Sequence, residues 1–575
     1  MRFLFEKWYM FCLLVTILIL VPLSTTNAVA LTDEATHMPT DKEWTITFNF
    51  PVIESSITPD SIYVMNSERE KQPVKISTQD NVVIVQAPDA GYNAGQTYTL
   101  HITSDILGQV GNEIESLKQP ITKPFTIATE VYTIVDIREN GTFSVASSHP
   151  TFDKANAYLQ EGQGMMLNEQ YVKIPSGFVA TNTQTVTSIY KEPIFTQKYE
   201  YTGVATDTEL TYVDATAEYV KVNAFGQDMY VKQEDVTLIP NTSAKGQSFY
   251  KANKQGLWHS VYHHHKGTYD AAYLIGKKPQ FLNEGVKYYS VDGANFINSN
   301  GKVAGESYAY FQYLSPRVPT SYSAEELNTY ITSQLAKKEK TGAAKYAHAT
   351  INSPLIGLGT TLKEMEKEHR INALFILSLA IHESDYGMSC HAQNYNNLFG
   401  LTVTDNNNQC SSNVDMSSSK YFTSITKNIA SLANVLNSTY LDPLNMNDYR
   451  YNGLALGNKM IGMNVRYASD PYWGEKTAGH MYSIDQELGS TDYKKHDIGF
   501  TSSREVSIRK EPVVNHNRAY QYKLEWTIKR LDKMPITLSA TPSETNGWLR
   551  VISELPKDGT DLYTVIENVR TVTTY

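Results

Sequence analysis

The sequence predicts a multidomain protein in which one mainly α-helical domain is flanked by all-β domains. At 575 residues, the chain is too long for a single hydrophobic core. Short alternating runs of apolar and polar residues, separated by Pro and Gly, fill much of residues 31–240 and return after residue 491. Between them, residues 371–381 are apolar on nearly every side, which is typical of a helix buried in a helical core.

The first 30 residues have the composition of a secretory signal peptide. Two basic residues precede an apolar run at 10–23, and Ala-Val-Ala at 28–30 fits the small-x-small rule for signal peptidase. Because the run is short for a membrane span, we expect residues 1–30 to be removed. The mature protein would then be secreted, begin near Leu31 and have no stable membrane span. An uncleaved N-terminal anchor is the alternative.

Residues 31–129 have the pattern of a β-sandwich. The predicted strands are separated by turn-forming prolines and glycines and occupy residues 44–50, 61–64, 81–85 and 97–102. The segments WTITFNFPV, SITPDSIYV and GYNAGQTYTLHI resemble the bacterial immunoglobulin-like domains of exported Gram-positive proteins. This resemblance implies a spacer or an adhesive module rather than a catalyst.

Residues 130–240 form a second β-rich region, with a short helical piece at 152–159. Its last segment, YVKQEDVTLIP, resembles small bacterial Src-homology-3-like barrels. Residues 241–320 are rich in Tyr, His and Gly and include three consecutive histidines at 263–265. Adjacent residues point in different directions, and no carboxylate or Cys lies at ligand spacing, so we predict no metal site there.

Helices are predicted throughout residues 321–490. Ser323 and the Ala-Glu-Glu that follows it form a capping box for a helix at 325–335. Further helices are expected at 362–369, 372–384, 424–436 and 473–488.

The helix at 372–384 ends in one carboxylate, Glu383. The apolar helix removes water from this carboxyl group, and the negative end of the helix dipole disfavours a second negative charge. We therefore expect the pKa of Glu383 to be raised, as in a general acid. Gly387 is expected to stop the helix, and a polar loop at 394–400 suits a sugar-binding cleft. His382-Glu383 does not begin a zinc-protease H-E-x-x-H motif, because Tyr386 stands where the second His would be.

Two separated motifs in this region resemble glycoside hydrolase family 73, the bacterial endo-β-N-acetylglucosaminidases that cut peptidoglycan. The first is Glu383-Ser-x-x-Gly-x-Ser389, followed by Asn-Asn-Leu-Phe-Gly at 396–400. The second is Arg-Tyr-Ala-Ser-Asp-Pro-Tyr at 466–472, in which Ser469 replaces the Thr usual in the family. The segments KYYSVDGANFIN and YAYFQYLSPRVPTSYSAEELNTYI resemble the stretch before the catalytic domain in exported Bacillus-type glucosaminidases.

The resemblance implies a lysozyme-like catalytic domain at 321–490, packed against a linking β region at 241–320. It also implies cleavage of the β-1,4 bond after N-acetylglucosamine in peptidoglycan, with Glu383 protonating the leaving oxygen. The partners would be peptidoglycan glycan strands and the cell wall, and no cofactor is expected. Two alternatives remain: a non-catalytic cell-wall-binding protein or adhesin, and a lytic transglycosylase or muramidase acting after N-acetylmuramic acid.

The group that works opposite Glu383 stays open. Asp415, in the polar segment after the first motif, is the favoured second carboxylate, ahead of Asp405, whose place is more typical of a turn. In the alternative, the N-acetyl group of the substrate attacks the anomeric carbon, and Tyr467 and Asp470 orient it. The substrate-binding residues that the motifs predict are Asn396, Asn397, Phe399, Asp470 and Tyr472.

Charge and cysteine content limit the partners and the compartment. The net charge of −10 is unlike the basic surface that nucleic-acid binding requires, so no nucleic-acid partner is expected. Of the three cysteines, Cys12 leaves with the signal peptide. The remaining pair, Cys390 and Cys410, suggests a disulfide in an exported protein.

Residues 491–575 return to strands, predicted at 505–509, 524–528 and 547–552. VSIRKEP and NGWLRV resemble bacterial Src-homology-3-like repeats that bind cell-wall peptides, which implies a small C-terminal barrel. Trp548 is either a platform for a ligand or part of the barrel core. These features together indicate an exported protein associated with a cell wall of the Gram-positive type.

Overall fold

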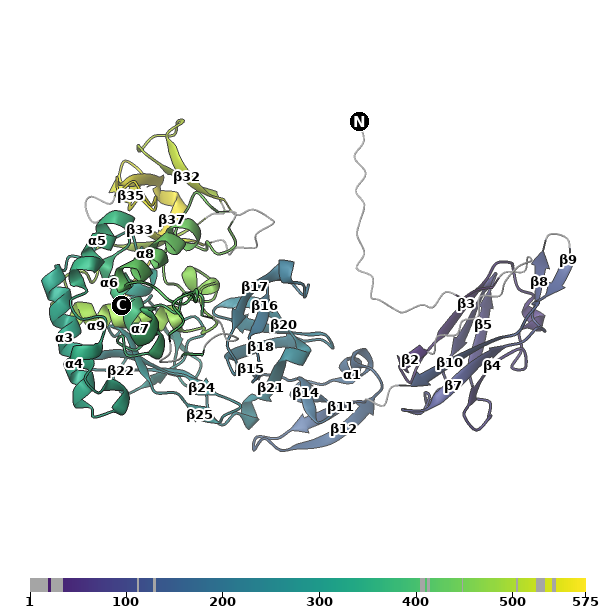
Figure 1. Cartoon of the computed structure of the whole chain (residues 1–575). Helices are drawn as coiled ribbons and strands as arrows, with labels where there is room; N and C mark the ends of the chain where they lie inside the picture. Colours follow the sequence, from purple (N-terminus) through teal and green to yellow (C-terminus); the bar gives the residue numbers. More distant parts are fainter. Residues whose placement is uncertain are drawn as a thin grey trace. The chain divides into compact units, whose positions relative to one another are not determined.

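The computed structural model describes residues 19–21, 35–110, 113–127, 131–403, 409–410, 414–446, 448–502, 505–523, 533–539 and 544–575. The chain divides into two compact units, Met1–Pro175 and Ser176–Tyr575 (Figure 1). In the part of the chain that is described, no helix is long and apolar enough to cross a membrane.

The first unit begins with two four-stranded sheets around one core. One sheet has the order β1 (Ile19–Val21), β3 (Trp44–Phe48), β6 (Val82–Gln86) and β5 (Lys75–Gln79). The other has the order β2 (Ala35–Met38), β10 (Ile121–Ile127), β7 (Thr97–Ile102) and β4 (Ile62–Asn66). A hairpin of β8 (Leu107–Val110) and β9 (Glu113–Ser116) is attached. Alternate residues of β3 are buried, which confirms the strand pattern predicted for the sandwich.

A smaller sheet completes this unit. Its strand order is β12 (Phe143–His149), β11 (Tyr132–Ile137), β13 (Gln163–Leu167) and β14 (Gln170–Lys173). Helix α1 (Phe152–Tyr158) is capped by Thr151 and buries Phe152 against this sheet. The boundary between the two units therefore falls inside the β-rich region at 130–240.

The second unit opens with a seven-stranded sheet. In spatial order its strands are β17 (Glu200–Val204), β16 (Thr187–Tyr190), β20 (Gln227–Lys232), β19 (Tyr219–Ala224), β18 (Glu209–Ala215), β15 (Gly177–Thr181) and β21 (Val236–Pro240). A four-stranded sheet follows, in the order β26 (Tyr273–Gly276), β23 (Gly256–Ser260), β22 (Phe249–Asn253) and β27 (Lys287–Tyr288). Two short hairpins pair β24 (Tyr262–His263) with β25 (Thr268–Tyr269) and β28 (Asn295–Ile297) with β29 (Val303–Glu306). A Src-homology-3-like form for these strands stays a prediction.

A helical layer follows in the chain, and Figure 1 shows it gathered around α6. Its helices are α2 (Tyr310–Tyr313), α3 (Ala324–Lys340), α4 (Ala349–Asn352), α5 (Gly359–His369), α6 (Ala373–Ser384), α7 (Cys390–Tyr395), α8 (Ile425–Val435) and α9 (Trp473–Glu487). The five helices that the sequence predicts occur as α3, α5, α6, α8 and α9, and Ser323 forms the expected capping box with Glu326. The start of the predicted polar loop is wrong, because Ser389 caps α7 and carries helix through Tyr395.

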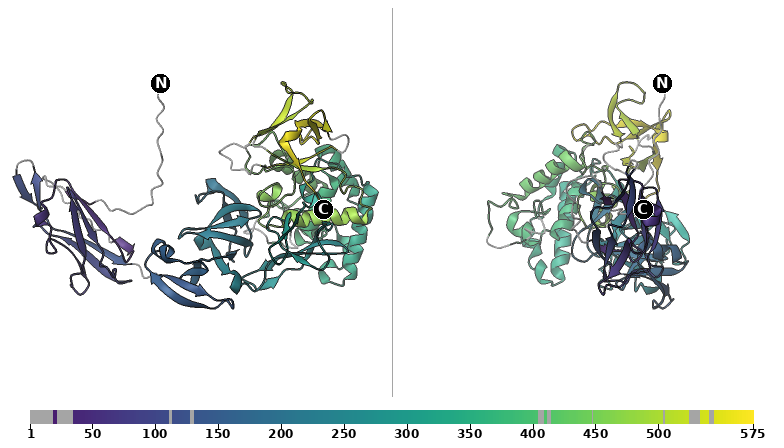
Figure 2. Two further views of the ribbon diagram at one scale, coloured as in Figure 1. Left: turned by 180° about the vertical axis from the view of Figure 1, so that it is seen from behind. Right: turned by 90° about the vertical axis from the view of Figure 1, so that its right-hand side faces the viewer.

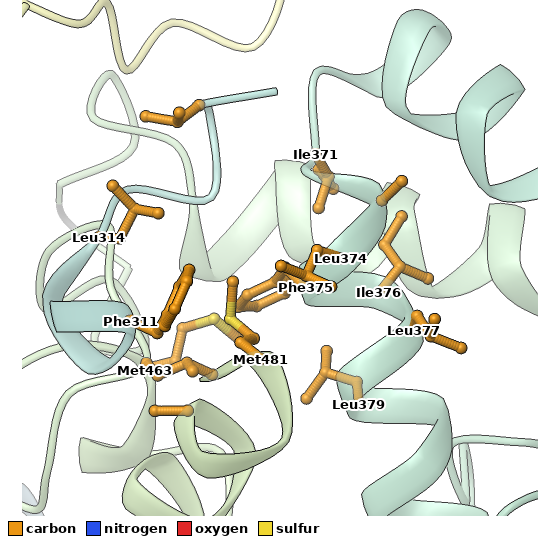
Figure 3. Packing of buried hydrophobic residues seen from close by; sticks show 14 of the residues in the cluster. Phe311, Leu314, Ile371, Leu374, Phe375, Ile376, Leu377, Leu379, Met463 and Met481 are labelled. Atoms are coloured by element: carbon orange, nitrogen blue, oxygen red, sulfur yellow. The ribbon is translucent and has the colours of Figure 1, made fainter. Parts of the chain in front are cut away.

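Helix α6 lies in the centre of this layer. Asn372 caps it by accepting hydrogen bonds from the backbone N–H groups of Leu374 and Phe375. All residues from Ala373 to Ile381 are buried, and α6 packs against α5 and α9. Figure 3 shows Phe375 beside Met463 and Met481. Because the helix is packed on all sides, the position of its C-terminal end is fixed by the core.

The C-terminal strands adjoin the helical layer, as the yellow segment in Figure 2 shows. One sheet has the order β33 (Pro535–Thr537), β30 (Ile498–Thr501) and β37 (Val569–Thr571). The other has the order β32 (Arg518–Lys523), β31 (Glu505–Arg509), β36 (Leu562–Val565), β35 (Trp548–Val551) and β34 (Glu544–Thr545). The buried Arg317 joins them to the helices by donating to the backbone oxygens of Glu554 and Leu441. The strand predicted at 524–528 lies outside the described residues.

Candidate active site

Glu383 occupies the last turn of α6, one residue before the helix ends. The chain leaves the helix through Asp385 and Tyr386, both in the left-handed conformation with φ of 50° and 61°. Asp385 is held there by Lys345 and by the hydroxyl of Tyr346, at 2.6 and 2.7 Å. The prediction that Gly387 stops the helix is therefore wrong by two residues.

Gly387 is needed for a different reason. Its φ is +76°, and a Cβ atom added there would meet Ser353 Oγ at 2.6 Å. Its backbone N–H donates to Ser384 Oγ at 2.8 Å. Gly387 thus lets the chain turn closely under the end of α6 and keeps Glu383 at the edge of the core.

The carboxyl group of Glu383 is partly buried and accepts a hydrogen bond from the indole Nε1 of Trp473 at 2.6 Å. Burial raises the pKa of Glu383, the Trp473 hydrogen bond opposes this, and the charge of Asp470 raises the pKa further. The net direction is upward, because loss of water is the largest cause. A carboxyl group that accepts through one oxygen can carry a proton on the other, which suits a general acid.

Tyr467 lies beside the same indole. Its ring stacks on Trp473 with centroids 4.4 Å apart, and the ring of Tyr440 meets it edge-on at 5.4 Å. Burial, and next the charge of Glu383, hold the pKa of Tyr467 well above its usual value. The phenol therefore keeps its proton and is available as a hydrogen-bond donor. The structure brings Glu383, Trp473 and Tyr467 together.

Asp470 and Tyr472 lie at the start of α9 and are engaged with other parts of the unit. Asp470 accepts from the backbone N–H of Tyr472 at 2.9 Å and pairs with Lys476 at 2.7 Å. The ring of Tyr472 meets the ring of His259 edge-on, with centroids 4.8 Å apart. These contacts anchor the first turn of α9, and contact of either residue with a substrate stays a prediction.

The residues of the Asn-Asn-Leu-Phe-Gly motif lie in and under the turn after α7. Asn396 is the left-handed C-cap residue of α7, and its side chain donates to Phe422 O at 2.8 Å. Asn397 is 1% exposed, donates to the backbone oxygens of Leu401 and Lys420, and accepts from Leu401 N. Phe399 is buried in the core. These contacts give the motif a role in holding the loop, whereas substrate contacts by Asn396, Asn397 and Phe399 stay predictions.

The second carboxylate candidate, Asp415, is exposed. Hydrogen bonds from the side chain and backbone of Ser417 lower the pKa of Asp415, so it is ionised near neutral pH. A disulfide joins Cys410 to Cys390 of α7, with Cα atoms 6.1 Å apart. Asp405 lies outside the described residues.

Two residues of this region were missed by sequence reasoning. From the sequence, Trp473 is only the first residue of a predicted helix. It directly follows the second motif, and an aromatic residue in that place is the signal that could have identified it. Lys459 is a lone cation in the mostly apolar run LALGNKMIGMNV, and it is 1% exposed. Its ammonium group donates to the backbone oxygens of Asn464 and Ala468, which flank Tyr467.

The histidine triplet has structural partners. His263 pairs with Asp270 and His264 with Glu209, both at 2.9 Å. No group of three or more His, Cys, Asp or Glu side chains within the described residues has an arrangement that could hold a metal ion. A cavity of about 490 Å³ in the same unit is lined by Phe225, Tyr308 and Phe500 among others, and its lining includes none of the predicted site residues.

Comparison with protein families identifies two domains. Residues 359–486 match the glucosaminidase family, described as mannosyl-glycoprotein endo-beta-N-acetylglucosaminidase. Residues 24–127 match the family of bacterial Ig-like domains. The chain thus carries a glucosaminidase domain that contains Glu383, Tyr467 and Trp473, together with a bacterial Ig-like domain. The resemblances to the family of endo-β-N-acetylglucosaminidases and to bacterial immunoglobulin-like domains are confirmed, and the resemblance to Src-homology-3-like domains stays a prediction.

Two Streptococcus pneumoniae proteins, from strains TIGR4 and R6, are similar to part of the chain. Each is named "Putative endo-beta-N-acetylglucosaminidase" and is 31% identical over 268 residues. The match covers 46% of this chain and 34% or 32% of the relative, so the chain spans about a third of the length of these relatives.

Among solved structures, the chain is similar to autolysin E of S. aureus, with a TM-score of 0.23 and 20% identity. That match covers 31% of this chain and 72% of the other. A catalytic mutant of autolysin E in complex with the disaccharide NAG-NAM gives the same TM-score and identity and covers 34% of this chain and 82% of the other.

Proposed function

We propose that this protein is an exported glycoside hydrolase, an autolysin that cleaves the β-1,4 bond after N-acetylglucosamine in the glycan strands of peptidoglycan. The glucosaminidase domain at 359–486 supports the reaction class. The observation that carries the proposal is Glu383, a partly buried carboxyl group with a raised pKa at the end of a core helix inside this domain. The predicted signal peptide and the Ig-like domain support export and a place at the cell wall.

In the proposed mechanism, Glu383 delivers its proton to the oxygen of the leaving sugar as the glycosidic bond breaks. After bond cleavage, the same carboxylate can take a proton from the attacking water. Trp473 orients the carboxyl group through its indole N–H, because a hydrogen bond at 2.6 Å restricts rotation of the side chain. The carboxyl group thus presents its proton in one direction.

The group that stabilises the anomeric carbon is proposed in two forms. In the first, Asp415 acts as the nucleophile or as the base that activates water. In the second, the N-acetyl group of the substrate attacks the anomeric carbon, and the phenol of Tyr467 holds it in place. The position of Tyr467 on Trp473, which binds Glu383, favours the second form.

The test is digestion of purified sacculi with the recombinant mature protein, followed by mass analysis of the soluble products. Products with N-acetylglucosamine at the reducing end are expected. N-acetylmuramic acid at the reducing end would instead identify a muramidase, and 1,6-anhydro ends would identify a lytic transglycosylase. Release of no products by a folded protein that binds the sacculi would favour a wall-binding protein or adhesin.

A further inference from the structure

Lys459 is a buried cation that the proposed chemistry does not use. It lies in the irregular chain between α8 and α9, where every residue from 451 to 465 is buried. Its ammonium group donates to Asn464 O at 3.0 Å and to Ala468 O. These two oxygens lie three residues before and one residue after Tyr467. The ammonium group therefore closes the bend that carries Tyr467.

The same bend is held from outside by strand β17. Thr202 Oγ1 donates to Val465 O at 2.6 Å, and the guanidinium of Arg466 pairs with Glu200 Oε1 at 3.1 Å. Within the bend, Asn464 Nδ2 donates to the backbone oxygens of Asp470 and Pro471 at 3.2 and 3.0 Å. The hydrogen bonds of Lys459 thus satisfy backbone oxygens of the bend, which backbone N–H groups would satisfy in a helix or a strand.

We propose that Lys459 is a positioning residue, whose ammonium group holds the bend at 464–468 so that Tyr467 stacks on Trp473 while Trp473 binds Glu383. Removal of a cation from water is unfavourable, so a buried lysine needs strong acceptors, and the two carbonyl oxygens are such acceptors. A neutral amine would form weaker hydrogen bonds to these carbonyl oxygens than the ammonium group does. The effect on activity rests on the proposed function, whereas the effect on the geometry of Trp473 does not.

The charge on Lys459 should change in the range of neutral pH. Burial lowers the pKa of Lys459 to about 7; the charges of Asp470 and Glu200 oppose this, and the charge of Arg466 adds to it. Burial also lowers the pKa of His382 to about 4 and that of His480 to about 3, so these imidazoles lose their protons at lower pH. Loss of the Lys459 proton near pH 7 can therefore be distinguished from loss of the His382 and His480 protons.

The first test uses Lys459→Met, which keeps an unbranched side chain but removes the charge and the donors. The indole N–H resonance of Trp473, assigned with Trp473→Phe, is recorded by NMR in full-length protein labelled at tryptophan. A changed resonance is expected in Lys459→Met, restoration toward the wild-type position in Lys459→Arg, and no change in Lys337→Met. Lys337 is a matched control because it pairs with Glu487 on the surface. An unchanged resonance in folded Lys459→Met would overturn the proposal.

A second test needs no change at Lys459. In Glu383→Gln, where residue 383 no longer titrates, the Trp473 resonance should shift with a midpoint near pH 7. Absence of that shift would count against the proposal even if Lys459→Met does not fold. On sacculi, Lys459→Met should lower kcat by roughly 10–100-fold with little change in KM, because misplaced groups reduce the rate of the bound complex. A lower affinity with unchanged kcat would refute positioning, whereas an inactive wild-type protein would refute only the proposed function.

Discussion

Glu383 and Tyr467 both contact the indole ring of Trp473, but they are positioned in different ways. Glu383 is carried by α6, whose residues from Ala373 to Ile381 are all buried. Tyr467 is carried by a bend that is held by Lys459 and by strand β17, which precedes it by more than 250 residues. The position of the acid thus depends on one helix and its core, whereas the position of the phenol depends on distant parts of the chain.

The same reasoning extends the proposed positioning of Tyr467 to the seven-stranded sheet. No motif in the sequence connects residues 200–204 with catalysis. In the structure, Tyr201 OH donates to Met460 O at 2.7 Å, and Ala205 N donates to Ser469 O at 2.8 Å. These bonds lie on either side of the bend. We therefore expect changes in α6 to affect the position of Glu383 and changes in β17 to affect the position of Tyr467.

The largest expected effect is that of Glu383→Gln. The amide keeps the shape of the side chain but cannot deliver a proton, so hydrolysis of sacculi should fall by at least ~10²–10⁴-fold. Release of reducing ends measures the loss. Glu487→Gln is the control, because Glu487 also ends a helix but pairs with Lys337 on the surface. Activity of Glu383→Gln within a few-fold of wild type would remove Glu383 from the mechanism.

Glu383→Gln should also change how the free energy of unfolding depends on pH. The folded-state pKa of Glu383 is raised, so the folded state binds this proton more tightly than the unfolded state does. The favourable contribution is present below the unfolded pKa and is lost as pH rises through the folded pKa. Glu383→Gln should therefore be more stable than wild type at neutral pH, with a smaller difference in acid. Urea unfolding at both pH values measures this, and a variant less stable at neutral pH would contradict the assigned cause.

The next effect distinguishes the two forms of the mechanism. Tyr467→Phe removes a donor close to Glu383 and should lower kcat by about 10²-fold, as loss of one positioned donor does. Asp415→Asn should lower it less, because Asp415 is exposed and its hydrogen bonds are to Ser417. The two variants are compared on the same sacculi. A larger loss in Asp415→Asn would establish Asp415 as the second group and exclude assistance by the substrate.

The disulfide is expected to affect stability more than chemistry. It closes a ring over a sequence separation of 20. Its replacement in Cys390→Ser/Cys410→Ser should destabilise the domain by ~3 kcal/mol if chain entropy dominates. The loss in kcat should stay on the order of tenfold or less, because neither cysteine holds Glu383 or Tyr467. Unfolding in denaturant gives the first quantity, and two free thiols in the non-reduced wild-type protein would refute the bond.

The difference between the helix that carries Glu383 and the bend that carries Tyr467 also decides how much of the site could be predicted from the sequence. Helix α6 and the acid at its end are local features, since the eleven residues 371–381 carry the pattern and the carboxylate of Glu383 follows two residues later. The irregular bend at 464–468 has no periodicity, and its order comes from Thr202, Glu200 and Lys459, whose contacts only the folded chain shows. The motif at 466–472 marked the place of Tyr467, but not that Trp473 would connect it with Glu383.

The smallest expected effect is the most direct test of this difference, because it involves Glu200, which contacts the bend from outside the glucosaminidase domain. Glu200 and Arg466 form a pair at 3.1 Å whose side chains are 25% and 20% exposed. Because water screens such a pair, we expect a coupling of about 1 kcal/mol in a double-mutant cycle of Glu200→Gln and Arg466→Met. If the pair holds the bend, a coupling of similar size should appear in kcat, a factor of about five.

The matched control is the pair of Arg570 with Glu306, which also joins distant segments of this unit at 3.2 Å. Arg570→Met and Glu306→Gln should change stability by no more than this amount, because these side chains are 49% and 40% exposed. They should leave kcat unchanged, because neither residue contacts the bend. A coupling in stability but none in kcat for Glu200 and Arg466 would show that β17 supports the fold without positioning Tyr467. Equal couplings in kcat for both pairs would show that activity follows global stability, and the positions of Glu383 and Tyr467 would then not depend on different parts of the chain in the way proposed.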